Sequence, residues 1–120
     1  MPVLVLIVDD DFHSAQLFKM IVEREGYEGF TALDAQDAIA LLNERVPDLV
    51  LLDLGLPGMD GLDLIKYIRA RDTLAHTRIL VISAYTDMIA RAQRTSADDY
   101  LVKPISNTQL LTRIKALLEE

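Results

Sequence analysis

Acidic side chains gather where two apolar runs of the sequence end. Asp9, Asp10 and Asp11 follow the run at residues 3–8, and Asp53 follows the run at 49–52. Neighbouring carboxylates at partly buried strand ends repel each other, and a divalent cation with oxygen ligands relieves that cost. Mg²⁺, or Mn²⁺ in its place, accepts such ligands and keeps water molecules that can give way to phosphate oxygens. The pattern therefore predicts a metal site that acts on phosphate.

A hydroxyl and an ammonium group follow two further apolar runs. Ser83 follows the run at 79–82, and Lys103 follows the run at 100–102 and directly precedes Pro104. A lysine is a point charge suited to a phosphoryl group, and a hydroxyl can donate a hydrogen bond to one. Asp53 is itself a potential nucleophile that would form an acyl phosphate. A cis Lys103–Pro104 bond would aim the lysine inward, and this bond is a candidate for that form.

Each of these residues, taken alone, has a simpler interpretation. An acidic triplet is as readily a solvated loop, and Asp11 is expected to cap the following helix. An aspartate at a strand end can bond its own loop, and a serine there is usually a turn residue. A lysine before proline usually lies in a surface loop. The predicted site therefore depends on all of these positions converging on one edge of a sheet.

The apolar runs alternate with stretches of helical periodicity. The runs are rich in Val, Ile and Leu without polar alternation, which is typical of parallel strands covered on both faces. They lie at residues 3–8, 29–31, 49–52, 79–82 and 100–102, of which 29–31 is weak and is inferred from the rhythm alone. The helical stretches lie at residues 14–25, 35–45, 60–71, 87–95 and 107–119, with 87–95 the loosest and Ser106 a cap. The order predicts one α/β domain over residues 1–120, with its ligands at the carboxyl ends of the strands.

Composition excludes several classes of protein. The chain has 120 residues, no cysteine and a formal net charge of −7. Without cysteine there are no disulfides, zinc–thiolate sites or thiol nucleophiles. Such an acidic domain is poorly suited to a nucleic acid backbone, and its apolar runs are too short to span a membrane. With no signal peptide ahead of the first run, we expect a cytoplasmic domain that binds neither nucleic acid nor membrane by itself.

Four motifs, in order along the chain, resemble the receiver domain of two-component response regulators. They are VDDD at 8–11, LLDLGLPGMDG at 51–61, ISA at 82–84 and DDYLVKP at 98–104. The resemblance covers the whole chain. It implies a CheY-like, doubly wound (βα)5 fold of the flavodoxin-like type, with a five-stranded parallel sheet in the order 2-1-3-4-5.

The resemblance also implies a role for each matching residue. Asp53 would accept the phosphoryl group, Lys103 would pair with that group, and Ser83 would be the switch hydroxyl. Asp10 would bind Mg²⁺ directly and Asp9 mainly through water, with Asp53 as a further ligand. The remaining implied parts are the backbone carbonyl of Gly55 on the metal, the backbone N–H of Ala84 on the phosphoryl group, and Tyr100 as the switch aromatic that turns inward.

The implied function is a phosphoacceptor signalling domain that catalyses only its own phosphorylation and dephosphorylation. The donor would be a phosphohistidine on a sensor histidine kinase or a histidine phosphotransfer protein. A downstream protein, or a second copy in a phosphorylation-dependent dimer, would bind the face of the fourth helix, fifth strand and fifth helix. The contacts expected on this partner face are Arg91, Arg94, Tyr100 and Lys115.

Departures from the family pattern remove no catalytic part; they fall at Phe12, Gly55, Tyr85, Ser96 and Ile105. We expect the Tyr85 ring to shield the phosphoryl group from water.

One alternative is a phosphatase of the haloacid-dehalogenase type, but it would need a second aspartate at residue 55. Another is a flavin-binding electron carrier, whose phosphate would meet the repelling acidic triplet at 9–11. The third is a non-phosphorylated interaction module.

Overall fold

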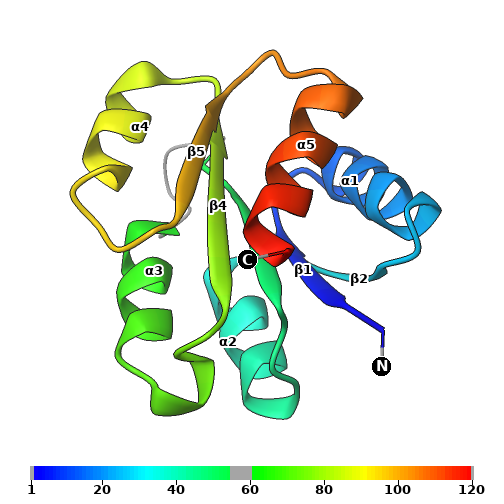
Figure 1. The fold of residues 1–120 in the computed structure, drawn as a ribbon. Coiled ribbons are helices and arrows are strands. Elements are labelled where there is room, and N and C mark those ends of the chain that lie inside the picture. The colour runs from blue at the N-terminus through cyan, green and yellow to red at the C-terminus, as the bar shows by residue number, and fades with distance from the viewer. Residues whose placement is uncertain (1, 55–60, 120) are drawn as a thin grey trace.

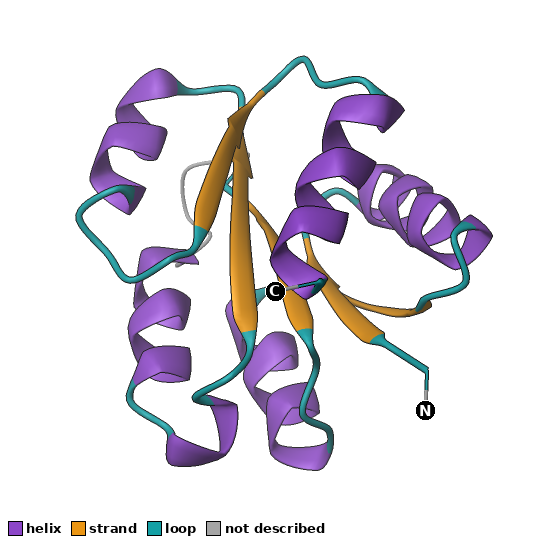
Figure 2. Cartoon of the chain, viewed as in Figure 1, coloured by secondary structure: helices purple, strands orange, loops and turns teal. Residues whose placement is uncertain are grey.

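Strands and helices alternate along the part of the chain that the computed structural model describes, residues 2–54 and 61–119 (Figure 2). The strands are β1 (Leu4–Val8), β2 (Glu28–Ala32), β3 (Leu49–Asp53), β4 (Arg78–Ser83) and β5 (Asp99–Val102). They pair in parallel in the order β2-β1-β3-β4-β5, which confirms the expected sheet. The weak run at 29–31 is therefore a full strand, and it forms one edge of the sheet.

Helices connect the strands and cover both faces of the sheet (Figure 1). They are α1 (Phe12–Arg24), α2 (Ala35–Glu44), α3 (Gly61–Arg69), α4 (Thr86–Ala92) and α5 (Asn107–Leu118), with a short 3-10 helix, η1, at Asp72–Leu74. Each predicted helix is confirmed, with ends that differ by a few residues. No helix in the described ranges is both long and apolar enough to cross a membrane.

Helix ends follow local capping chemistry. The Asp11 carboxylate accepts hydrogen bonds from the backbone N–H groups of His13 and Ser14, so α1 begins two residues earlier than its apolar periodicity predicted. Asp11 is thus a cap, as expected. The 3-10 helix η1 was not predicted, because three residues are too short to show a periodic pattern.

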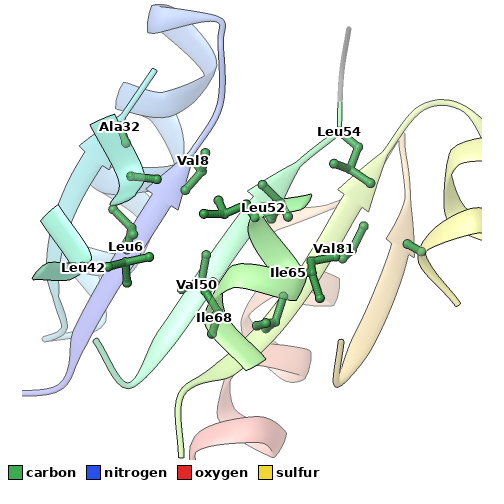
Figure 3. Close-up of a cluster of buried hydrophobic side chains, with 14 of the residues drawn as sticks. Leu6, Val8, Ala32, Leu42, Val50, Leu52, Leu54, Ile65, Ile68 and Val81 are labelled. Carbon is green, nitrogen blue, oxygen red and sulfur yellow. The ribbon is translucent and has the colours of Figure 1, made fainter. Parts of the chain in front are cut away.

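The core consists of two layers, because successive side chains of a strand point to opposite faces of the sheet. In β1, Leu6 and Val8 belong to the layer between the sheet and helices α2, α3 and α4 (Figure 3), whereas Val5 and Ile7 belong to the layer between the sheet and helices α1 and α5. We call these sides the α2–α4 face and the α1–α5 face. The strand residues of the α1–α5 face are Val5, Ile7, Leu49, Leu51, Leu80, Ile82 and Leu101. Burying a side chain of this kind stabilises the fold by about 1.5–3 kcal/mol, so the central strands are firmly held.

Two backbone features shape the edge where the strands end. The Lys103–Pro104 peptide bond is cis, the form for which it was a candidate. Gly61, at the start of α3, packs so closely against the buried Leu54 that a Cβ at Gly61 would overlap Leu54 Cδ2. This close approach places the start of α3 against the residue that follows Asp53.

The cap of α5 gives a test of this local structure. The Ser106 hydroxyl accepts from the Gln109 N–H, and the Gln109 side chain accepts from the Ser106 N–H, each at 3.0 Å. We expect Ser106→Ala to lower the free energy of unfolding, measured with urea, by about 1 kcal/mol. Thr108→Ala, an exposed change in the same turn, should stay within about 0.5 kcal/mol of the parent protein. Equal losses in the two variants would contradict the capping role.

Candidate functional site

Three charged side chains share the α1–α5 face of the sheet edge. Asp9, Asp53 and Lys103 each follow, by two residues, a strand residue that packs on that face. The strands β1 and β3 are neighbours with Val8 paired to Leu52, so the two aspartates come next in register. Both aspartates are only 2% exposed. Strand alternation therefore brings together residues that lie far apart in the sequence.

Lys103 forms an ion pair with the buried Asp53. Its Nζ lies 2.5 Å from Asp53 Oδ2, and its side chain keeps 30% of its surface exposed. The backbone N–H of Lys103 donates to the Ser83 carbonyl at 2.8 Å, which fixes the start of the lysine at the end of β4. From there the side chain passes the end of β4 to reach β3, because β4 lies between β3 and β5. The ammonium offsets part of the cost of burying the Asp53 charge.

Burial shifts the pKa of the Asp9 carboxyl. Desolvation by burial, together with the charge of the neighbouring Asp53, raises the pKa of Asp9 from 3.8 to about 7. The Asp11 N–H, which donates to Asp9 Oδ1 at 2.9 Å, and the Lys103 charge oppose this shift in pKa. One proton or one cation at this position would therefore stabilise the pair of aspartates.

The buried oxygens of this pair have few polar neighbours. Among the described residues, Asp9 Oδ2 and Asp53 Oδ1 are buried without a regular hydrogen bond, and Asp53 Oδ2 has the Lys103 ammonium beside it. Such atoms are costly unless water or a cation reaches them. Mg²⁺ commonly uses one or two carboxylates and fills its remaining positions with water, so this donor set fits it. Within residues 2–54 and 61–119, no three acidic, histidine or cysteine side chains gather into a metal-binding group.

The other predicted metal ligands are less closely defined. Asp10 is half-buried in the turn after β1, and its role as a direct ligand stays a prediction. Gly55, whose carbonyl was expected on the metal, lies outside the described residues. The structure therefore brings Asp9 and Asp53 together and leaves the contribution of Asp10 to experiment.

Ser83 points to the opposite side, the α2–α4 face, because it follows Ile82 in β4. It is fully buried, and its hydroxyl donates to the Leu54 carbonyl at 2.9 Å and accepts from the Tyr85 N–H at 3.0 Å. A hydroxyl has one proton, so Ser83 must release Leu54 before it can donate elsewhere. Ala84 and Tyr85 follow at the surface, and Tyr85 keeps 45% of its surface exposed.

Tyr100 lies on the same side of the sheet as Ser83. It pairs in register with Val81, and its ring packs against the core of the α2–α4 face. Its hydroxyl donates to the Ala97 carbonyl at 3.2 Å. Burial, together with the charges of Asp98 and Asp99, raises the pKa of Tyr100 above its usual value. The two predicted switch residues therefore share one face.

Besides Tyr100 on β5, the residues predicted to contact a partner lie on or next to α4 and on α5. Arg91 is exposed on α4, where it reaches the Met88 sulfur at 3.7 Å, and Arg94 is exposed just after this helix. Lys115 on α5 instead forms an ion pair with Glu25 at the end of α1, at 3.1 Å, which raises the pKa of Lys115. Helices α4 and α5 cover opposite faces of the sheet (Figure 1). The contact role of these residues stays a prediction.

Three parts of the site were not predicted. One is the Leu54 carbonyl that holds Ser83, and a backbone acceptor leaves no side-chain signal in a sequence. Another is the ring of Phe18, which was assigned only to the buried stripe of α1 and whose centroid lies 6.0 Å from Lys103 Nζ. The third is Arg113 on α5, which binds both carboxylate oxygens of Asp99 at 2.8 Å and so ties α5 to β5.

The fold and the buried pair of aspartates define a doubly wound α/β protein with its site at the carboxyl ends of the strands. The chain belongs to the response regulator receiver domain family, which residues 5–115 match. A putative response regulator from Chloroflexus aurantiacus J-10-fl is similar over all of both chains, with 30% identity and a TM-score of 0.91. This membership favours the receiver interpretation over the phosphatase and electron-carrier alternatives.

Two further solved structures are similar to this chain. Chemotaxis protein CheY4 from Vibrio cholerae has 28% identity and a TM-score of 0.89, and the match covers 98% of this chain and 100% of that one. NtrX from Brucella abortus, solved in complex with ADP, has 33% identity and a TM-score of 0.88. The match covers 99% of this chain and 27% of NtrX, so the same domain also occurs as part of a longer protein.

The raised pKa of Asp9 predicts how stability depends on pH in the absence of metal. The fold holds this proton more tightly than the unfolded chain does, so the stabilisation is complete below pH 3.8 and is lost as the pH rises through about 7. Asp9→Asn removes that loss. We expect this variant to gain on the parent protein by on the order of 2 kcal/mol between about pH 5 and 8.

Urea denaturation in the presence of a chelator measures this difference. The exposed Asp63→Asn is the control, because it removes the same charge without removing a buried one. A difference between Asp9→Asn and the parent protein that stays constant across this range of pH would contradict the assignment.

Proposed function

We propose that this domain accepts a phosphoryl group on Asp53 and serves as the phosphoacceptor of a two-component phosphorelay. The observation that carries the proposal is the state of the Asp53 carboxylate. It is buried beside the Asp9 carboxylate, and the Lys103 ammonium lies 2.5 Å from its Oδ2. These are the features of a carboxylate nucleophile placed where negative charge can be neutralised.

Asp9, Asp10, Asp53 and the Gly55 carbonyl would hold Mg²⁺, or Mn²⁺ in its place. When bound, the metal neutralises phosphoryl oxygens. The side chains act by their positions: an Asp53 oxygen would attack phosphorus, and the Lys103 ammonium would offset negative charge on the phosphoryl group. The new oxygen–phosphorus bond forms as the nitrogen–phosphorus bond of a donor phosphohistidine breaks, and the histidine nitrogen keeps the electron pair. Donors of this chemistry are a sensor histidine kinase or a histidine phosphotransfer protein.

The bound group would change the hydrogen bonds on the other side of the sheet edge. A phosphoryl oxygen would compete with the Leu54 carbonyl for the Ser83 proton, and the Ala84 N–H would be a further donor. When Ser83 moves, the space beside it changes for Tyr100, which lies on the same face. A local charge would thus bias a two-state element that a downstream protein reads, without chemistry on any other substrate.

Phosphorylation of Asp53 can be tested with a small phosphodonor and a divalent cation. We expect intact-mass analysis to show one phosphoryl group on the parent protein and peptide mapping to place it on Asp53. Asp53→Asn should lose at least about nine-tenths of this label, because an amide is a far weaker nucleophile. Asp63→Asn, an exposed change, is the control and should keep the label. Full labelling of Asp53→Asn would refute the proposal.

The metal ligands can be separated by titration with Mg²⁺. We expect Asp10→Ala to weaken Mg²⁺ binding about tenfold or more, measured by calorimetry, because a direct ligand is lost. Asp11→Ala should leave Mg²⁺ affinity nearly unchanged and lower the free energy of unfolding by about 1 kcal/mol, since it removes a helix cap. Equal losses of affinity, or a larger loss in Asp11→Ala, would show that the assignment of these two positions is wrong.

A further inference from the structure

An aromatic ring lies beside the lysine of the site. Phe18 belongs to α1 and Lys103 follows β5, yet Lys103 Nζ lies 6.0 Å from the centroid of the Phe18 ring. The same Nζ is 2.5 Å from Asp53 Oδ2. The ammonium therefore has two partners from different elements, a carboxylate and an aromatic ring.

The position of Phe18 follows from the division of the sheet into two faces. Phe18 is 8% exposed and packs in the core of the α1–α5 face, the side on which Asp53 and Lys103 lie. Its ring is held by neighbours in this core, including Ala15, and Ile105 just beyond the lysine packs against the same core. The ring is thus a well-packed surface next to a partly exposed side chain.

The lysine needs such a surface because its side chain is long and partly exposed. A lysine side chain loses much rotamer freedom when it is held in one position, and 30% of the Lys103 side chain is open to solvent. Phosphorylation would place a new oxygen next to Asp53, and the ammonium would have to move from Asp53 Oδ2 toward it. The attraction of a cation to a ring face extends to about 6 Å and does not require one hydrogen-bond direction, so it can persist during that shift.

We propose that Phe18 is a positioning residue of the phosphoacceptor site, whose ring holds the Lys103 ammonium near Asp53 and thereby strengthens binding of a phosphoryl group. This inference rests on the proposed function, because it concerns the same lysine and the same ligand. It differs from a packing role for Phe18 in one respect. The contribution depends on the negative face of the ring and not on its bulk.

The test changes the ring face and keeps the shape. Replacing Phe18 by 3,4,5-trifluorophenylalanine withdraws electron density from the ring and weakens its attraction for a cation. The probe is beryllofluoride with saturating Mg²⁺, which mimics a phosphoryl group on a carboxylate. We expect trifluorophenylalanine at residue 18 to lower beryllofluoride affinity about two- to fivefold, and Phe18→Leu to lower it at least as much. In a Lys103→Ala background, fluorination should have no effect.

A control of the same chemistry is available in this chain. Phe30 also lies against a cation, with the Arg45 guanidinium carbon 4.6 Å from its ring centroid, but it belongs to β2 at the far edge of the sheet. The same fluorinated residue at position 30 should leave beryllofluoride affinity unchanged. In the metal-free protein, NMR should show a ring-current shift of the Lys103 ε-methylene protons that Phe18→Leu abolishes.

The outcomes separate the two proposals. Equal beryllofluoride affinity with and without fluorination of residue 18, in a parent protein that binds the probe, would overturn the positioning role alone. An effect of fluorination that persists in Lys103→Ala would also overturn it, because the ring would then act without the ammonium. A parent protein that does not bind beryllofluoride would refute the proposed function, and the positioning role with it.

Discussion

Asp9 and Asp53 are buried next to each other, and the described structure places the Lys103 ammonium against them. Two like charges in a poorly solvated place are unfavourable unless positive charge or a proton joins them. Most of the molecule serves to maintain this arrangement. Apolar side chains on both faces of the sheet hold β1 and β3 side by side. The lysine follows β5, and its side chain extends across the end of β4 to Asp53. The site therefore holds closely spaced, poorly solvated charges at the edge of a well-packed sheet.

The frame also separates two kinds of chemistry. Asp9, Asp53 and Lys103 lie toward α1 and α5, whereas Ser83 and Tyr100 lie toward α2, α3 and α4. Ser83 connects the sides through the backbone, because its hydroxyl holds the carbonyl of the residue that follows Asp53. Gly61 packs against that same residue and brings the start of α3 into the connection. Asp53 is thus linked to the α2–α4 face through the next residue, Leu54, which contacts both Ser83 and Gly61.

The fold could be predicted from the sequence because its signals are local. Apolar runs without polar alternation indicate buried parallel strands, and Ser106 and Asp11 mark helix starts by their capping chemistry. The run at 29–31 was weak because β2 is an edge strand with only part of its surface buried. The approach of Asp53 and Lys103 was also predictable, since parallel strands end at one edge.

What could not be predicted depends on contacts between distant segments. The Ser83 hydroxyl donates to a backbone carbonyl, and a backbone acceptor cannot be recognised from residue types in the sequence. Lys115 was named only as a contact of the partner face, and its ion pair with Glu25 at the end of α1 joins two helices that lie far apart in the sequence. The apolar periodicity of α1 showed that Phe18 is buried, but it could not show that Lys103, from the segment after β5, lies near the ring.

The alternation of side chains along the strands sets a rule for how such a chain can change over evolution. Many substitutions in the loops leave each strand-end residue on its own side of the sheet. A single residue inserted into or deleted from β3 or β4 would instead move the later side chains of that strand to the opposite face of the sheet. Asp53 would then point away from Lys103, or Ser83 would point toward it. We therefore expect changes of length to be tolerated in the loops and not within these strands.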